Sequence, residues 1–308
     1  MIRLHLSCTL RLRALTLLIV ALSVQPGHAG SAPPARASVC AQLIAVRTAD
    51  GVQLDGMLYR AAGKPRRPSL LLVHGYGGSF YGGYLPVMAQ AAAQQGYTAL
   101  ALNMRDHDAG PKTSRFTDNA TDIAAGLKYL RELGHTQFVL LGQSMGTNRV
   151  LYYQASTGDP NVAATVLVSG PGNLFEWNVW QFGKEKAQAS VDDAAKLAAA
   201  GREDEMMLVD LGPLGKALYS AGYLLSLRGP QAQSDPYRNL QKVGNPVLIV
   251  QGKQDRLVAP EIGERLRAAA QLSRRVDLLL MEGADHGFRG QEGVLIERVL
   301  RWLKQVAP

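Results

Sequence analysis

Ser144 stands in a local sequence that could make it a nucleophile. It is the centre of GQSMG at residues 142–146, a G-x-S-x-G pattern that follows the apolar run 138–141 and opens a helical stretch. A tight turn between a strand and a helix lifts a serine hydroxyl clear of the sheet, and the flanking glycines leave room for so sharp a turn. The hydroxyl is still a weak nucleophile without a base, and the base needs an orienting acid. The rest of the chain should therefore supply a histidine and a carboxylate.

His286 is the expected base. For a serine on this kind of turn, the acid and then the histidine come later in the chain. His286 is the only histidine after Ser144, and it lies in EGADHGF at 282–288, directly after the last expected strand, 276–281. It thus occupies the position that the chemistry requires, whereas a lone histidine elsewhere would more simply be structural.

Asp255 is the favoured orienting acid. It ends GKQD at 252–255, just past the apolar run 246–251. The carboxyl ends of parallel strands are where open α/β sheets place their sites. Asp285 and Glu282 are the competing acids, but they lie too close in sequence to His286 to reach behind its ring easily.

Hydrolysis of an acyl group also needs N–H donors for the oxyanion. We predict the backbone N–H of Met145 as one donor, because it follows the serine at the start of a helix. The glycine-rich loop HGYGG at 74–78 should supply the other. Tyr76 is our choice there, with Gly75 and Gly77 as alternatives. His74 precedes Ser144 and does not fit the expected order, so we interpret it as a structural residue of this loop.

These residues must be positioned by alternating strands and helices. Residues 42–60 alternate apolar and polar side chains around Asp50 and Gly51, which predicts an antiparallel hairpin. Short apolar runs and helical patterns alternate after it. The expected strands are 70–73, 97–103, 138–141, 163–168, 246–251 and 276–281, and the expected helices are 85–95, 118–134, 144–154, 260–270 and 294–303. Continuous apolar strands between helices predict an α/β fold with a mostly parallel sheet covered on both faces.

One long segment interrupts this alternation. Nearly eighty residues separate the run that ends at Val168 from the run that starts at Pro246. So long an insertion is usually functional or a small subdomain. We predict a helical cap over 171–240, with helices around 192–200 and 214–227, inserted before the penultimate strand. The core would then comprise residues 42–170 and 241–308.

The first 29 residues are typical of a secretory signal. They contain Arg3, Arg11 and Arg13, no acidic residue, the short apolar run 14–24, and small residues before position 30. An uncleaved N-terminal anchor is the alternative. Residues 30–41 form a Pro/Ala/Ser-rich linker. Removing the three arginines lowers the net charge from +8 to +5. The remaining charge is dispersed, so we expect no nucleic-acid partner, no stable membrane insertion after cleavage, and a periplasmic or secreted protein.

The chain resembles the α/β-hydrolases, of the capped serine-hydrolase kind that includes lysophospholipase-like and proline-iminopeptidase-like enzymes. The resemblance covers about residues 42–306 and is carried by five segments: HGYGG at 74–78, NMRDHD at 103–108, GQSMG at 142–146, GKQD at 252–255 and GADHG at 283–287. It implies Ser144 as nucleophile, His286 as base, Asp255 as acid, and a cap over the site.

The sequence departs from related patterns at two places. Residues 74–78 do not have the HGGG sequence of one lipase and esterase branch, and His107-Asp108 stands where many relatives have His-Gly. The serine at 144 argues against dehalogenase-like and epoxide-hydrolase-like members, which have aspartate there. It also argues against dienelactone-hydrolase-like members, which have cysteine.

The leading hypothesis is a serine esterase that cleaves small-molecule carboxylic esters through an acyl-enzyme, with no cofactor and no metal. A peptidase acting on amino-terminal residues is the alternative. It would need cap acids to bind the substrate ammonium, and seven are present: Glu176, Asp192, Asp193, Glu203, Asp204, Glu205 and Asp210. A third hypothesis is a hydrolase scaffold that binds a ligand without catalysis.

Overall fold

The computed structural model describes residues 38–61 and 68–307. The predicted signal peptide (1–29) and residues 30–37 of the predicted linker lie outside the described residues, as do residues 62–67. Within the described ranges, no helix is long and apolar enough to cross a bilayer.

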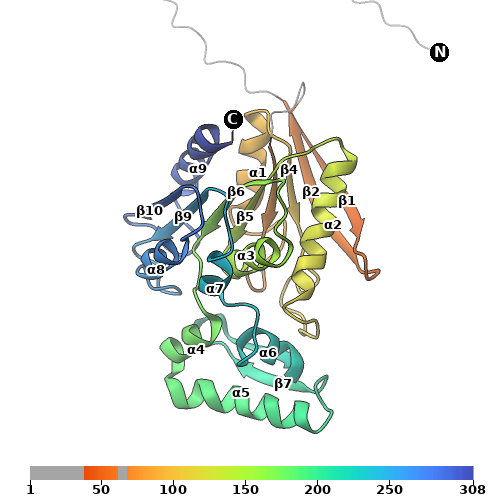
Figure 1. The fold of residues 1–308 in the computed structure, drawn as a ribbon, viewed down its shortest axis with the longest axis vertical. Helices are drawn as coiled ribbons and strands as arrows, with labels where there is room; N and C mark the ends of the chain where they lie inside the picture. The colour runs from red at the N-terminus through yellow and green to blue at the C-terminus, as the bar shows by residue number, and fades with distance from the viewer. Residues whose placement is uncertain (1–37, 62–67, 308) are drawn as a thin grey trace, which may run out of the picture. The chain divides into compact units, whose positions relative to one another are not determined.

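The central sheet has eight strands in the order β1-β2-β4-β3-β5-β6-β9-β10 (Figure 1). The hairpin of β1 and β2 and the β2–β4 pair are antiparallel, and the other neighbours are parallel. The strand bounds are β1 (Val39–Arg47), β2 (Gln53–Ala61), β3 (Ser69–Val73), β4 (Ala99–Leu102), β5 (Phe138–Gln143), β6 (Val162–Val168), β9 (Val247–Gly252) and β10 (Val276–Met281). The predicted mostly parallel sheet is confirmed.

Helices cover both faces of this sheet. Apolar side chains of α1 (Leu85–Gln94) and α9 (Glu292–Val306) share a core with one face. Those of α2 (Asp118–Glu132), α3 (Met145–Thr157) and α8 (Ile262–Ala269) share a core with the other. The central strands are buried from end to end because both of their faces are covered. This layering brings the carboxyl ends of β3, β5, β9 and β10 to one edge.

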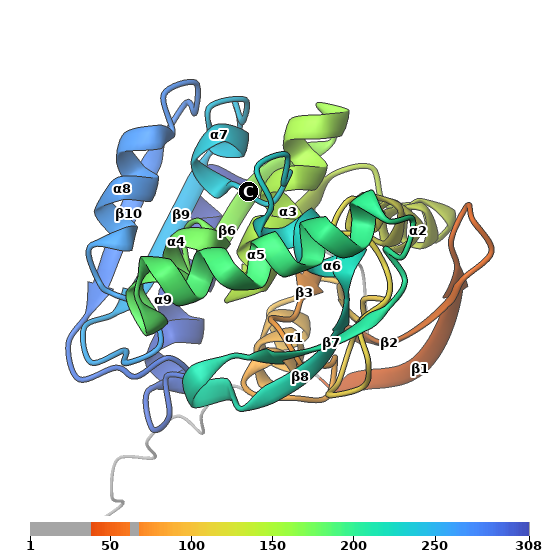
Figure 2. The same ribbon diagram turned by 90° about the horizontal axis from the view of Figure 1, so that it is seen from below.

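The cap is inserted between β6 and β9, as predicted, but it is not all helical. It contains α4 (Leu174–Phe182), α5 (Lys184–Ala199), the antiparallel pair β7 (Met206–Asp210) and β8 (Lys216–Ser220), and α6 (Ala221–Arg228). Figure 2 shows these elements from below, with α5 across the front. The helix predicted over 214–227 is therefore wrong in its first half. Gly212 and Gly215, at φ +57° and +83°, form the turn that sends the chain back as a strand.

Two predicted boundaries also change. β1 begins at Val39, inside the segment predicted as linker over 30–41. The short helix α7 (Pro236–Leu240) lies within the predicted cap, but Leu240 belongs to the apolar core that α2, α3 and α8 share with the sheet. The cap therefore ends, and the core resumes, before residue 240.

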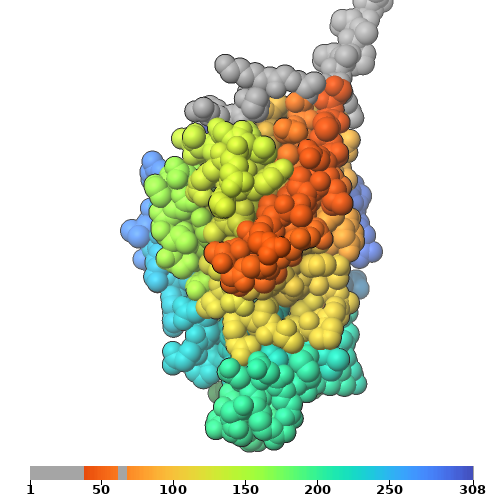
Figure 3. Space-filling view, turned by 90° about the vertical axis from the view of Figure 1, so that its right-hand side faces the viewer, coloured from red at the N-terminus to blue at the C-terminus, as the bar shows by residue number. Residues whose placement is uncertain are grey.

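The cap is joined to the core through a loop after β4. The Lys112 N–H donates to Leu218 O at 2.9 Å, and the Ser220 N–H donates to Lys112 O at 2.8 Å. In the space-filling view the cap, in blue-green, lies directly below the yellow segment that contains residue 112 (Figure 3). This pairing ties the cap hairpin to the edge of the sheet where the candidate site lies.

Candidate active site

Ser144 lies on a strained turn between β5 and α3. Its backbone has φ 51° and ψ −127°, outside the usual regions for a residue with a side chain. Two glycines make this turn sterically possible. A Cβ on Gly142 would lie 2.4 Å from Gly146 O, and a Cβ on Gly146 would lie 2.3 Å from Val73 O. The G-x-S-x-G pattern therefore folds as the tight strand-to-helix turn that was predicted.

His286 and Asp255 are joined by a hydrogen bond, although 31 residues separate them. His286 Nδ1 lies 2.8 Å from Asp255 Oδ2. Asp255 follows β9 and His286 follows β10, and these strands are parallel neighbours. Their carboxyl ends therefore bring the two side chains together.

The other oxygen of Asp255 fixes the carboxylate in place. Asp255 Oδ1 accepts hydrogen bonds from the backbone N–H groups of Leu257 at 2.8 Å and Val258 at 2.9 Å. The carboxylate side chain is 1% exposed, whereas that of His286 is 19% exposed. Asp255 thus lies buried behind the imidazole, and the imidazole itself is partly exposed to solvent. The competing acid Asp285 instead accepts from the N–H groups of Gly287 and Arg289.

His74 organises the loop that faces Ser144. Its Nε2 accepts the backbone N–H of Met104 at 3.0 Å, so the proton lies on Nδ1, which donates to Gly75 O at 2.7 Å. Burial, reinforced by the positive charge of Arg149, lowers the pKa of His74 to about 3. The ring is therefore neutral at physiological pH, and its role in the loop is structural. Gly75 must lack a side chain, because a Cβ there would lie 2.8 Å from Ser144 Cβ.

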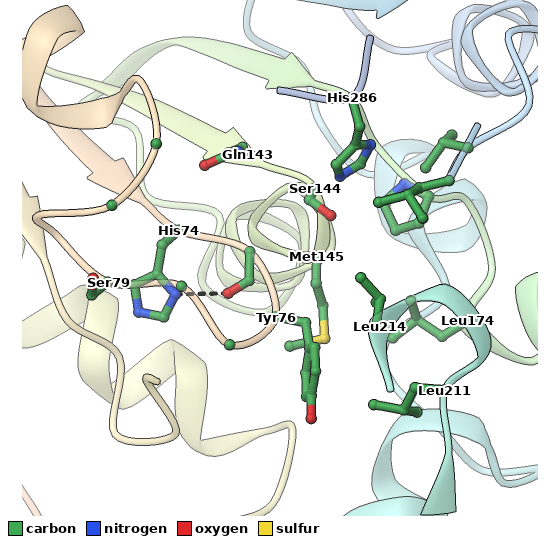
Figure 4. A pocket seen from close by; sticks show the side chains of 18 of the residues that line it. His74, Tyr76, Ser79, Gln143, Ser144, Met145, Leu174, Leu211, Leu214 and His286 are labelled. Atoms are coloured by element: carbon green, nitrogen blue, oxygen red, sulfur yellow. Dashed lines mark hydrogen bonds between the residues drawn. The ribbon is translucent and has the colours of Figure 1, made fainter. Parts of the chain in front are cut away.

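Four of the predicted site residues line a cavity of about 470 Å³. Ser144 and His286 line it, together with Tyr76 and Met145, the residues predicted to supply the oxyanion donors (Figure 4). Met145 is the first residue of α3, so its N–H has no intrahelical acceptor. The cap completes the wall with apolar side chains and two polar ones: Leu174, Trp177, Leu211, Leu214, Tyr219 and Arg228.

Sequence reasoning missed a buried ionic network beneath the site. Arg149 on α3 is fully buried, and its Nη2 donates to both oxygens of Asp106 at 2.8 Å. The Tyr223 hydroxyl, from the cap helix α6, donates to Asp106 Oδ2 at 2.7 Å. Burial alone would raise the pKa of Asp106, but these partners outweigh it and the pKa is lowered. The carboxylate is therefore ionised and joins the serine helix to the cap.

The structure explains how Asp108 fits at a position where many related sequences have glycine. Its backbone has φ 56°, in the left-handed region that glycine adopts most readily and that aspartate tolerates. The side chain lines the cavity, accepts from the Tyr81 hydroxyl at 2.8 Å and lies 2.7 Å from His107 Nδ1. The aspartate thus places a carboxylate at the cavity where glycine would place none.

Among the described residues, none of the seven cap acids considered for ammonium binding lines the cavity. Several pair with exposed cations instead: Glu176 with Arg265, Asp210 with Lys186, and Asp193 with Lys196. The described part of the chain also contains no group of three or more histidine, cysteine, aspartate or glutamate side chains placed to hold a metal ion.

Comparison with known proteins settles the family. The model of the alpha/beta hydrolase family matches residues 70–295, most of the chain. The chain belongs to this family. The predicted fold and family are confirmed. A curated relative, the putative esterase YheT of Escherichia coli (strain K12), is 26% identical over 267 residues, which cover 79% of this chain and 76% of that protein.

Solved structures show the same fold. Est1E from Butyrivibrio proteoclasticus is 17% identical with a TM-score of 0.64, covering 85% of this chain and 98% of its own. The Pyrococcus furiosus esterase Pf2001 is 18% identical with a TM-score of 0.64, covering 92% of this chain and 97% of its own. Est1E has also been solved with ferulic acid bound.

Proposed function

We propose that this α/β-hydrolase cleaves carboxylic esters with Ser144, His286 and Asp255 as its catalytic residues. The observation that carries the proposal is the placement of Ser144, on a strained turn, and of His286, bonded to Asp255, on the wall of one cavity. The esterase names of YheT, Est1E and Pf2001 support an ester as the substrate class.

In the proposed reaction, His286 Nε2 takes the proton of the Ser144 hydroxyl as Oγ attacks the ester carbonyl carbon. The resulting imidazolium gives that proton to the departing alkoxide, which leaves as the alcohol and yields the acyl-enzyme. Water then attacks the acyl carbon, His286 takes a proton from it, and Ser144 Oγ leaves with that proton as the carboxylic acid forms. Asp255 holds the ring with Nδ1–H toward its carboxylate and stabilises the positive charge.

The oxyanion formed in both steps needs donors already in place. We propose the backbone N–H groups of Met145 and Tyr76. Met145 begins α3, whose N-terminus also favours negative charge. Tyr76 follows Gly75, whose lack of a side chain lets the loop approach Ser144 closely.

Replacing the nucleophile tests the mechanism. Ser144→Ala should lower kcat for 4-nitrophenyl butyrate at least about 1,000-fold, because no acyl-enzyme can form. Ser156→Ala is the matched control on the same helix, since Ser156 is exposed and its hydroxyl bonds only Tyr153 O among the residues that the structure describes. A fluorophosphonate probe should label the wild type and the control but not Ser144→Ala. Undiminished turnover by Ser144→Ala would disprove the mechanism.

A parallel assay on an aminoacyl arylamide separates the esterase from the aminopeptidase alternative. Among the described residues the cavity offers no cap acid for a substrate ammonium, and the carboxylate that does line it, Asp108, is bonded to Tyr81 and His107. Esters should therefore be turned over in preference. Arylamide turnover exceeding ester turnover would reverse the assignment.

We also propose that the protein is exported. The support is the basic start, the apolar run 14–24 and the small residues that follow it. When the full sequence is expressed in a host with a secretory pathway, the recovered protein should begin near residue 30. N-terminal sequencing measures this, and a protein that begins at Met1 would count against cleavage.

A further inference from the structure

Arg228 carries a positive charge on the wall of the cavity and forms no ion pair with any of the described residues. It is the last residue of the cap helix α6 and is only 7% exposed. Within the described residues, its Nε and Nη1 atoms are buried and have no hydrogen-bond partner. A guanidinium stays protonated in proteins, so burial cannot be relieved by loss of a proton. A buried, unpaired cation is costly unless a ligand pairs with it.

The guanidinium faces the cavity's aromatic wall. Its carbon lies 5.7 Å from the centroid of the Tyr219 ring, and that ring packs edge-on against Tyr76 at 6.1 Å. Tyr76, Tyr219 and Arg228 all line the cavity with Ser144. The charge therefore lies at the cap side of the same space that would hold the substrate.

The carboxylates around the two cavities that Arg228 borders have other partners. In the second cavity, Glu176 pairs with Arg265, and Asp235 accepts from two backbone N–H groups of α7. The carboxylate of Asp106 is used by Arg149 and Tyr223. The carboxylate of Asp108 is bonded to Tyr81 and His107, and its side chain is 42% exposed, so solvent screens it. A second buried cation, Lys112, donates to three backbone carbonyl groups. The buried surroundings of the cavity are thus richer in positive than in negative charge.

We propose that Arg228 is a specificity-determining residue that binds a carboxylate on the substrate, so that the enzyme prefers esters carrying a second, ionised carboxyl group. This rests on the proposed ester hydrolysis for its kinetic readout. A guanidinium presents a planar set of N–H donors that matches a carboxylate, and bonds between charged partners are roughly twice as strong as neutral ones. The apolar side chains Leu174, Leu211 and Leu214 would contact the hydrocarbon part of such a substrate.

Matched substrates test the proposal. One is 4-nitrophenyl hydrogen adipate, and the other is 4-nitrophenyl 6-methylheptanoate, in which an isopropyl group replaces the carboxylate. A second pair carries the carboxylate or isopropyl group on the alcohol portion. For at least one pair, Arg228→Gln should lower the ratio of kcat/KM for the anionic ester to that for the neutral ester about 10- to 100-fold, mainly through KM. Arg228→Lys should retain part of the preference.

Arg238→Gln is the charge-matched control. Arg238 is exposed and borders a second cavity of about 280 Å³, which Arg228 also touches, but it does not line the first. Its variant should keep the wild-type ratio. An unchanged ratio in Arg228→Gln for both substrate pairs would overturn the proposal, and so would a loss that Arg238→Gln reproduces.

A binding measurement tests the role of Arg228 independently of ester hydrolysis. If the wild type hydrolyses no ester, the proposed function fails, and titration calorimetry with monomethyl adipate still decides the role of Arg228. The wild type should bind it at least about 10-fold more tightly than Arg228→Gln does. Equal affinities, or binding to neither protein, would show that Arg228 only packs on Tyr219.

Discussion

At the scale of single residues, two histidines of this chain show how surroundings decide a role. His286 has one nitrogen on a buried carboxylate and its ring on the cavity wall. His74 has both nitrogens bonded to backbone groups and is almost fully buried. The chain order of serine, acid and histidine distinguished the two from sequence. It could not reveal the Arg149–Asp106 pair, because those side chains meet only after α3 packs beneath the loop that follows β4.

The lowered pKa of His74 predicts an acid-sensitive contribution to stability. The folded pKa is about 3, against 6.5 for an unperturbed histidine. Between these values the unfolded chain binds a proton that the folded chain does not, so the free energy of unfolding falls as the pH falls from 6.5 toward 3. The contribution is fully present above pH 6.5 and changes by up to about 1.4 kcal/mol per pH unit within the window.

Urea unfolding at several pH values from 7 to 4.5 measures this contribution. His74→Gln should be less stable at pH 7, because its hydrogen bonds change, but its stability should fall less steeply on acidification. His107→Gln is the control, since the His107 ring is 40% exposed. Parallel pH profiles for wild type and His74→Gln would contradict the prediction. If His74→Gln does not fold, nitrogen NMR of the wild type should show a neutral, Nδ1-protonated ring for His74 at pH 5.

At the scale of elements, the buried parallel strands were predictable and the cap hairpin was not. Residues 70–73 of β3, 138–141 of β5 and 247–250 of β9 are continuously apolar, which is typical of strands covered on both faces. In β8 the exposed Leu218 lies between the buried Ala217 and Tyr219, an alternation of period two. Over so short a run, this alternation was obscured by the helical residues of α6 that follow it.

The serine turn predicts a severe effect for a single methyl group. Gly146→Ala would place a Cβ 2.3 Å from Val73 O and 2.8 Å from His74 O, both backbone atoms that cannot move without shifting the end of β3. We expect the free energy of unfolding to drop by at least about 2 kcal/mol and ester turnover to be lost with the turn geometry.

Gly293→Ala is the control for this substitution. Gly293 is exposed on α9, with nothing within 4 Å of a Cβ placed there. The alanine should not destabilise the protein and could add up to about 1 kcal/mol, because glycine is a poor helix former. Urea unfolding and circular dichroism measure both variants. A Gly146→Ala protein as stable and active as the wild type would mean that the turn has more room than the structure shows.

At the scale of the whole molecule, Asp106 connects the cap to the core. Its carboxylate accepts hydrogen bonds from Arg149, on the helix that begins after Ser144, and from Tyr223 in the cap. Its backbone carbonyl accepts a hydrogen bond from the Lys112 side chain, and the Lys112 backbone pairs with β8. The cap is therefore held by buried polar contacts as well as by its apolar core. It should unfold together with the core in one transition, and substitutions of Asp106 should destabilise both the cap and the core.

Asp106→Ala and Tyr223→Phe separate these contributions. Asp106→Ala leaves the fully buried Arg149 without a counter-charge and should cost about 3–5 kcal/mol. Tyr223→Phe removes only the hydroxyl bond to the carboxylate and should cost about 1.5–3 kcal/mol.

Because the Tyr223 bond needs the carboxylate, the double variant should lose less stability than the two single variants lose combined. Denaturant unfolding tests both points. It is followed by circular dichroism and by tryptophan fluorescence, which reports Trp177 and Trp180 in the cap and Trp302 in the core. Coincident transitions with non-additive losses would establish that Asp106 couples cap and core. Separate transitions, or strictly additive losses, would show that Asp106 does not couple the cap to the core.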